Sequence, residues 1–269
     1  MLRTRVLTAL VLAVVVLGVL FGAAPRTGAA FFGLAMLAGA LEWSAFAGLT
    51  QPLARVGYLL LTAVVGVMAW QLSGSATGRT TLMAVAALFW IVCFLWMTLA
   101  PGRVSRSAAV LAGLLVLVPA GVGIGRLLLA HGVFPGAYWL FFMLLLVWAA
   151  DIGAYFAGRA LGKHRLAPLV SPNKTVEGLA GGLALAGCVT VGGAFFFGVA
   201  LAPLSLLALA VVLASVIGDL TESMMKRAAG LKDSGKLLPG HGGVLDRIDS
   251  ITASVPFYVL GLGWLGVLG

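Results

Sequence analysis

Long apolar segments, separated by short polar ones, occupy almost the whole chain. Most of the apolar segments approach the roughly 20 residues that a helix needs to cross a bilayer. Proline, glycine and serine mark the breaks between them. The pattern predicts nine membrane-spanning helices, at residues 6–22, 30–48, 57–72, 81–100, 108–130, 136–157, 178–199, 203–222 and 251–268. We therefore expect an all-α, polytopic membrane protein.

Composition supports this fold class. Hydrophobic residues make up 62% of the 269 residues and charged residues only 9%, and the mean hydropathy is +1.13. A soluble domain carries about 25% charged residues, so lipid must solvate most of this surface. The first segment also resembles a signal peptide, with a basic start and small residues after the apolar run. We favour an uncleaved first span, because further spans follow down to the last residues of the chain.

The charge distribution predicts the orientation. A net charge of +9 could suggest a nucleic-acid partner, but the basic residues cluster in loops between spans. With the N-terminus in the cytoplasm, all but three of the 17 Lys and Arg residues fall on the cytoplasmic side; the exceptions are Arg26, Arg79 and Arg126. This bias follows the positive-inside rule. It places the polar loops 158–177 and 223–250 in the cytoplasm, and no nucleic acid is expected as a partner.

The expected spans form two regions. Residues 1–135 hold about five spans, and residues 136–269 hold the remaining spans and both long polar loops. Cys93 and Cys188 lie inside apolar segments, which argues against a disulfide framework or a thiolate metal site. One span carries a stripe of small residues at every fourth position: Gly178, Gly182, Ala186, Thr190, Ala194 and Gly198. Such a stripe allows close helix packing, within the bundle or in a homodimer.

Acidic residues are concentrated in one part of the chain. Seven of the eight lie between 151 and 249; the full set is Glu42, Asp151, Glu177, Asp219, Glu222, Asp233, Asp246 and Asp249. A carboxylate inside a membrane helix costs about 2.5–3.5 kcal/mol, so Asp151 and Asp219, at span ends, require partners. Asp219, Glu222 and Lys226 share one helix face, and Asp246 and Asp249 are three residues apart.

This group of acids suits Mg²⁺, alone or with a second cation, better than zinc, because it offers carboxylate oxygens without cysteine. Basic residues are interspersed among the acids: Lys226, Arg227, Lys232, Lys236 and Arg247. Carboxylates that hold a metal beside cations that hold anionic oxygens are typical of phosphoryl or nucleotidyl transfer. A purely structural charge cluster is the alternative.

The other polar loop offers further candidates. Residues 158–164 resemble a P-loop, but the spacing is one residue short and no strand precedes them. In "SPNKTVEG", Lys174 offers a point charge for phosphate, whereas Ser171, Thr175 and Glu177 can bind substrate or cap the next helix. In "PGHGG", His241 can contact substrate or be structural. The backbone N–H groups of Gly242 and Gly243 can approach an anion closely.

These motifs resemble those of a known family. The stretch "SMMKRAAGLKDSGKLLPGHGGVLDRID", residues 223–249, resembles the signature of the phosphatidate cytidylyltransferases (CDP-diacylglycerol synthases). Its matching elements are Ser223, Lys226-Arg227, Lys232-Asp233, His241-Gly242-Gly243 and Asp246-Arg247-Ile248-Asp249. Residues 150–178 are similar to the family's second conserved stretch, although Ile152 stands where a Ser or Thr is expected. The first five spans resemble the family only in hydropathy and length.

The resemblance implies the reaction of CTP with phosphatidic acid to CDP-diacylglycerol and pyrophosphate, a step of phospholipid biosynthesis. It also implies nine spans, a homodimer, and a site that faces the cytoplasm from the bacterial inner membrane. Asp219 and Asp246 would hold Mg²⁺, with Asp249 and Glu222 as further candidate ligands. The phosphate oxygens would be neutralised by Lys226, Arg227 and Arg247.

The remaining expected roles concern substrate binding. Lys174 and the turn from Ser171 to Thr175 would hold the CTP triphosphate, and Asp151 would position the nucleotide or a water. The other expected substrate-binding residues are Glu177, Ser223, Lys232, Asp233, His241, Gly242 and Gly243.

Two alternative functions remain. A CTP-dependent enzyme acting on an ether-lipid phosphate or a polyprenol would keep the nucleotide site and differ in its lipid groove. An ion-coupled transporter would bind cations at Asp151 and Asp219. Transport predicts acids near the middle of the membrane and repeated halves, whereas these acids lie at span ends and the sequence shows no repeat.

Overall fold

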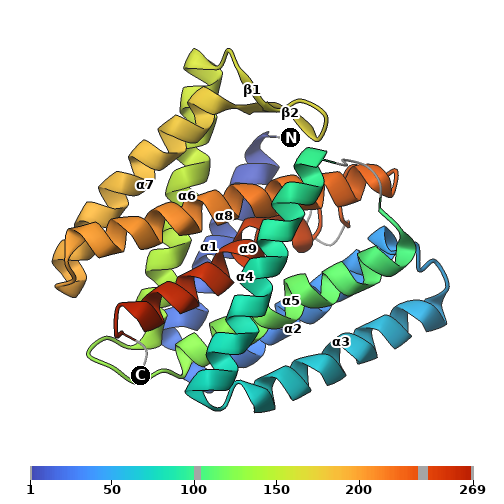
Figure 1. Cartoon of the computed structure of the whole chain (residues 1–269), viewed down its shortest axis with the longest axis horizontal. Coiled ribbons are helices and arrows are strands. Elements are labelled where there is room, and N and C mark those ends of the chain that lie inside the picture. Colours follow the sequence, from blue (N-terminus) through green and yellow to red (C-terminus); the bar gives the residue numbers. More distant parts are fainter. Residues whose placement is uncertain (1, 100–103, 236–241, 268–269) are drawn as a thin grey trace.

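A computed structural model describes residues 2–99, 104–235 and 242–267. Within these residues it contains nine α-helices and one two-stranded sheet (Figure 1). The elements are α1 (Leu2–Gly22), α2 (Pro25–Phe46), α3 (Pro52–Leu72), α4 (Ala76–Leu99), α5 (Arg106–Leu128), α6 (Gly136–Leu161), β1 (Arg165–Ala167), β2 (Ser171–Thr175), α7 (Val176–Phe197), α8 (Leu201–Ala228) and α9 (Leu245–Trp264). Each predicted span overlaps one helix, which confirms the all-α fold class.

In the described part of the chain, seven helices, α2 to α8, are long and apolar enough to cross a membrane by length and composition. The protein is therefore a multi-pass membrane protein. In α1, the side chains are described without a gap only from Leu10, and that part, Leu10–Gly22, is apolar. In α9, charged residues occupy the first turns. Spanning by α1 and α9 stays a prediction.

The helix starts differ from the predicted spans for a simple reason. The expected second and third spans begin at residues 30 and 57, but α2 and α3 begin at Pro25 and Pro52, each after a residue in extended conformation. Proline is tolerated there because the first helical N–H has no partner within the helix. Two other helices, α6 and α8, differ from the predicted spans at their C-terminal ends, because they continue past the apolar residues to Leu161 and Ala228. This extension projects polar side chains of both helices beyond the spans.

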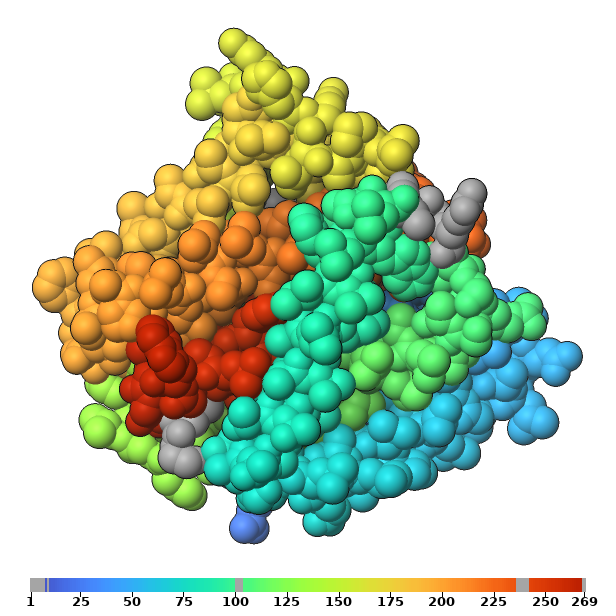
Figure 2. All heavy atoms as spheres, viewed as in Figure 1, coloured from blue at the N-terminus to red at the C-terminus, as the bar shows by residue number. Residues whose placement is uncertain are grey.

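Close packing in the bundle depends on small residues of α6 and α7. A Cβ added at Gly182 would lie 2.6 Å from the carbonyl oxygen of Ala150, and one at Gly153 would lie 2.4 Å from that of Gly181. The yellow-green α6 and the golden α7 are neighbours (Figure 1), and the golden atoms of α7 adjoin the yellow atoms at the top of the space-filling view (Figure 2). The stripe residues from Gly178 to Thr190 are buried within the single chain. The packing interpretation of the stripe is thus confirmed.

The sequence did not predict the hairpin of β1 and β2, which lies in the expected polar loop 158–177. Its strands pair antiparallel, Arg165 with Thr175 and Ala167 with Ser171. β1 has only three residues, and the five residues of β2 are polar or proline, so neither strand shows apolar–polar alternation. Thr175 ends the hairpin and caps α7, since its hydroxyl accepts a hydrogen bond from Gly178 N at 3.1 Å. The capping interpretation of Thr175 is confirmed.

Candidate functional site

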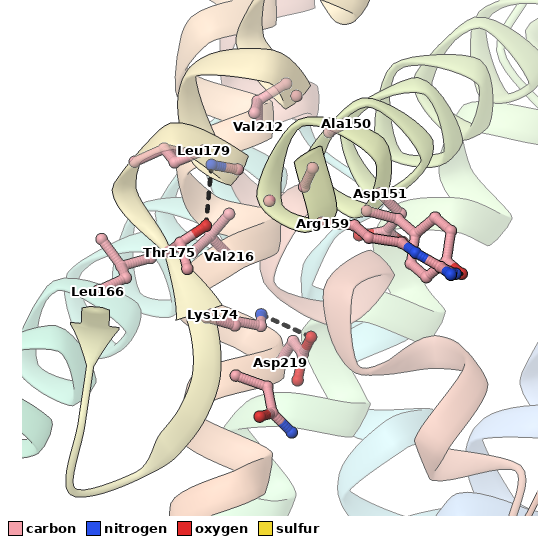
Figure 3. A pocket seen from close by; sticks show the side chains of 16 residues that line it. Ala150, Asp151, Arg159, Leu166, Lys174, Thr175, Leu179, Val212, Val216 and Asp219 are labelled. Carbon is pink, nitrogen blue, oxygen red and sulfur yellow. Dashed lines mark hydrogen bonds and ion pairs between the residues drawn. The ribbon is translucent and has the colours of Figure 1, made fainter. Parts of the chain in front are cut away.

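A cavity of about 460 Å³ lies between α6, the hairpin, α7 and α8 (Figure 3). Its walls are partly apolar, with Leu166, Leu179 and Val216 among the lining residues. Its charged lining residues are Asp151, Arg159, Lys174 and Asp219. An apolar wall beside charged groups of both signs suits a ligand that combines apolar and ionic parts.

Lys174 and Asp219 form an ion pair in this cavity. Lys174 Nζ of β2 lies 2.6 Å from Asp219 Oδ2 of α8, and both side chains are about one-third exposed or less. Figure 3 shows the two side chains pointing toward each other. Ser223, one turn further along α8, donates to Asp219 Oδ1 at 3.4 Å. The ion pair therefore joins the two polar segments that the sequence analysis singled out separately.

A second charge cluster surrounds Lys226. Its Nζ lies 2.6 Å from Asp246 Oδ1 and 3.1 Å from Glu222 Oε1. The Glu222 side chain is only 3% exposed, and its Oε1 atom has no hydrogen bond of acceptable geometry despite the nearby ammonium group. Lys226 therefore contacts two carboxyl groups of different helices at once.

The Asp246 carboxylate is held by several donors. Its Oδ2 accepts hydrogen bonds from Gly243 N at 2.8 Å and from both the backbone N and the hydroxyl of Ser234 at 3.0 Å. Burial raises the pKa of Asp246, but the hydrogen bonds from Lys226 and Gly243 lower it more, so that it lies below its usual range. This carboxylate is therefore ionised at neutral pH.

The glycines beside Asp246 are needed for this geometry. Gly242 has a φ of 80°, in the left-handed region. A Cβ on Gly243 would lie 2.1 Å from Ser234 Oγ. The sequence analysis assigned both glycines to an anion of the substrate. In the structure, the N–H of Gly243 donates to the carboxylate of Asp246 instead.

Asp249 links the two clusters. Its carboxyl group interacts electrostatically with that of Asp219 in the first cluster and with that of Glu222 in the second. Close approach of α9 to α8 makes this possible, since a Cβ on Gly218 would lie 2.5 Å from the carbonyl oxygen of Asp249. The structure thus brings together the four acids that were predicted as metal ligands along the α8–α9 contact.

Those acids do not form a preformed metal cage. Among the described residues, no group of three or more His, Cys, Asp or Glu side chains is close enough to hold a metal ion. Mg²⁺ is usually bound by one or two carboxylates together with waters and substrate phosphates. The oxygen donors of these carboxyl groups therefore fit a Mg²⁺ that binds with the substrate.

Several predicted residues lie apart from the two clusters. Glu177 contacts the other end of the hairpin segment, accepting from the backbone N of Lys163 and lying 2.6 Å from His164 Nδ1. Exposed side chains on the loop and helix ends are those of Arg227, Lys232 and Asp233. Arg247 is also exposed, but it interacts electrostatically with Asp151 of the cavity. Ser171 pairs with Ala167 in the sheet. His241 lies outside the described residues.

The sequence analysis missed Glu42. This acid of α2 lies in a long apolar helix, yet its carboxylate contacts the segment before α9. Ser234 Oγ donates to Oε2 at 2.9 Å, and Val244 N and Leu245 N donate to the carboxylate at 3.0 and 2.9 Å. The signal was present, because a carboxylate in an apolar helix needs a partner.

The chain belongs to the cytidylyltransferase family, whose sequence profile matches residues 3–264. This family membership confirms the resemblance read from the motifs.

Two bacterial relatives are similar over nearly the full length. The phosphatidate cytidylyltransferase of Pseudomonas aeruginosa is 42% identical over 277 aligned positions, covering 98% of this chain and 99% of that protein. The phosphatidate cytidylyltransferase of Haemophilus influenzae is 40% identical over 283 positions, covering 96% and 97%.

Proposed function

We propose that this protein transfers the cytidylyl group of CTP to phosphatidic acid, giving CDP-diacylglycerol and pyrophosphate. The observation that carries the proposal is the Lys174–Asp219 ion pair, which joins both polar segments in one cavity of a membrane protein. Membership of the cytidylyltransferase family and the names of the two relatives support this reaction. A lipid substrate explains why the charged groups lie at the ends of apolar helices.

The reaction needs two anions to be brought together. An oxygen of the lipid phosphate attacks the α-phosphorus of CTP and forms a new P–O bond. The bond from that phosphorus to the oxygen bridging the α- and β-phosphates breaks, and the electron pair leaves with pyrophosphate. The attacking phosphate is already ionised near neutral pH, so the step requires no general base. Positioning and charge neutralisation supply most of the catalysis.

The residues divide into two groups by their place. Lys174, with the Ser171–Thr175 strand, would hold the CTP triphosphate at the cavity mouth, and Asp151 would position the nucleotide. Lys226 would neutralise phosphate oxygens from within the helix bundle, with Arg227 and Arg247 at its surface. Because Lys174 and Lys226 already contact carboxylates, their ammonium groups are fixed in place before any phosphate arrives.

Asp219 and Asp246 are the proposed Mg²⁺ ligands, with Asp249 and Glu222 as further candidates. When bound, Mg²⁺ would neutralise charge on the phosphates. Asp219, which contacts Lys174, would hold the cation beside the ammonium group that binds the triphosphate. The hydrogen bonds from Ser234 and Gly243 keep Asp246 in position for the same role.

We further propose that the site faces the cytoplasm from a bacterial inner membrane. The basic residues follow the positive-inside rule for this orientation, and CTP is a cytoplasmic solute. The homodimer implied by the family resemblance is part of the same proposal.

The reaction can be tested with purified protein in mixed micelles. Labelled CTP, phosphatidic acid and Mg²⁺ should give labelled lipid and pyrophosphate, and EDTA should stop both. Label that enters a polyprenol or an ether-lipid phosphate, but not phosphatidic acid, would keep the nucleotide site and change the lipid. Folded protein that transfers label to none of these lipids would refute the enzymatic function and favour transport.

A further inference from the structure

We propose that Glu42 is a positioning residue for Asp246, acting through Ser234 and the start of α9. This inference rests on the proposed function, in which Asp246 is a metal ligand. Glu42 is 192 residues away from Ser234 and 203 from Leu245 in sequence. Its helix is packed against α5, and α5 against α9. The Glu42 carboxylate thus accepts hydrogen bonds from Ser234, near the end of α8, and from Val244 and Leu245, directly before Asp246.

The first connection passes through Ser234. Its hydroxyl oxygen lies 2.9 Å from Glu42 Oε2 and 3.0 Å from Asp246 Oδ2. A hydroxyl group has one proton, so at any moment it donates to only one of the two carboxylates. The backbone N of Ser234 also donates to Asp246. When a cation takes up negative charge on Asp246, the hydroxyl proton can turn toward Glu42 without leaving the network.

The second connection is the N-terminus of α9. The residue before the helix, Val244, has no capping side chain. Its backbone N and that of Leu245 donate to Glu42 instead. The first N–H groups of a helix have no partners within the helix, and a carboxylate there is favourable. Glu42 therefore caps α9 from another helix, one residue before Asp246.

The surroundings of Glu42 show that this contact is closely fitted. A Cβ added at Gly235 would lie 2.4 Å from Glu42 Oε1, and one at Gly243 would lie 2.3 Å from Oε2. Bare backbone is thus required on both sides of the carboxylate. Glu42 therefore acts on Asp246 through Ser234 and the backbone that precedes Asp246, and this role needs no contact between Glu42 and the substrate.

The test is the Glu42→Gln variant in the full-length protein purified in detergent. Glutamine keeps the shape but turns an NH₂ group toward an N–H or hydroxyl donor. We expect Mn²⁺, used as a spectroscopic probe, to bind about 10- to 100-fold more weakly. In turnover, the Mg²⁺ concentration for half-maximal activity should rise by a similar factor, with partial rescue at high Mg²⁺. Mn²⁺ binding is measured by the loss of the free-ion EPR signal, without any reaction.

Three further variants, two single and one double, separate positioning from a general loss of structure. Ser44→Ala removes a buried hydroxyl from the same helix, where it contacts Leu41 O and Arg55 Nε, and should leave Mn²⁺ binding unchanged. Ser234→Ala should weaken Mn²⁺ binding, and the Glu42→Gln/Ser234→Ala double variant should be no weaker than the worse single variant. Such non-additivity indicates one connected network. If Glu42→Gln does not fold, Ser234→Ala carries the same test.

Unchanged Mn²⁺ affinity in folded Glu42→Gln, additive losses, or a wild-type protein that binds no Mn²⁺ would each overturn the inference. A wild-type protein that binds Mn²⁺ but transfers no cytidylyl group would instead refute the proposed function. In that case the binding comparison would still decide whether Glu42 positions Asp246.

Discussion

At the scale of single residues, the charge clusters combine groups that are far apart in the sequence. The sequence identified Asp219 by its place at a span end, Lys174 by the polar motif around it, and Asp246 by the cluster of acids and the family signature. It did not reveal that Lys174 contacts Asp219 and that Lys226 contacts Asp246. Such pairs depend on how helices cross, which hydropathy does not record.

Asp246→Asn tests the inner cluster. The neutral amide cannot accept from every donor that now contacts the carboxylate, and it removes the charge that would hold a cation. We expect turnover to fall by about 100-fold or more. Lys226 keeps Glu222 as a partner, so the protein should remain folded. Turnover is measured with labelled CTP, and folding by elution and thermal unfolding in detergent. The control is Thr98→Val, outside both clusters; wild-type turnover in Asp246→Asn would remove Asp246 from the site.

Lys174→Ala tests the outer cluster. If Lys174 holds the triphosphate, its loss removes a charge-assisted hydrogen bond of about 1.5–3 kcal/mol, which corresponds to a roughly 10-fold or larger rise in the KM for CTP. The KM for the lipid should change less. Lys163→Ala is the matched control, because Lys163 is an exposed lysine of the same connection. Equal increases in both KM values would contradict a role specific to the nucleotide.

At the scale of elements, the sequence predicted the helices well because each one is a long apolar run. The predicted second and third spans start later in the sequence than α2 and α3, which begin at Pro25 and Pro52. The hairpin was not predicted because β1 has only three residues and β2, Ser171–Thr175, has no alternating apolar positions. The stripe on α7 was recognised, but its partner was not: Gly182 meets the backbone of α6. Spacing reveals a close-packing face, whereas only the structure identifies what packs there.

Gly182→Leu tests that packing. The new side chain would begin 2.6 Å from the carbonyl oxygen of Ala150, so α6 and α7 must move apart. Overpacking of this kind costs about 1–3 kcal/mol, and Gly182 also lines the cavity. We expect a lower unfolding temperature in detergent together with reduced turnover. Gly187→Leu, on the same helix, is the control because no atom lies within 4 Å of its added Cβ. Equal destabilisation by both variants would exclude a specific α6–α7 effect.

At the scale of the whole molecule, the distribution of basic residues and the position of the site favour the same orientation, with the hairpin in the cytoplasm. Nearly all basic residues fall on the side of the hairpin and the 223–250 segment if the nine spans are correct. At the opposite end, Arg126 of α5 is accommodated by local contacts. Its Nε donates to Ser73 Oγ at 3.0 Å, and its guanidinium group lies 4.0 Å from the centre of a Trp70 ring. One arginine on that side therefore has a structural partner and does not weaken the predicted orientation.

This orientation can be measured with two exposed positions at opposite ends. Leu169 at the turn of the hairpin is 82% exposed, and Val133 between α5 and α6 is 95% exposed. In a variant with Cys93 and Cys188 replaced, a cysteine is introduced at one position at a time. With the N-terminus in the cytoplasm, Val133→Cys should react with a membrane-impermeant maleimide in intact spheroplasts. Leu169→Cys should react only after lysis.

The reverse labelling pattern would invert the topology. It would place the cavity on the side where CTP is absent, and the proposed reaction would then lack its nucleotide. Reaction of both cysteines in intact spheroplasts would mean that the number of spans between α5 and the hairpin is even. Because α6 alone connects these two points, that outcome would require α6 not to cross the membrane. Labelling of Val133→Cys alone would place Lys174 and Asp219 on the side from which CTP arrives.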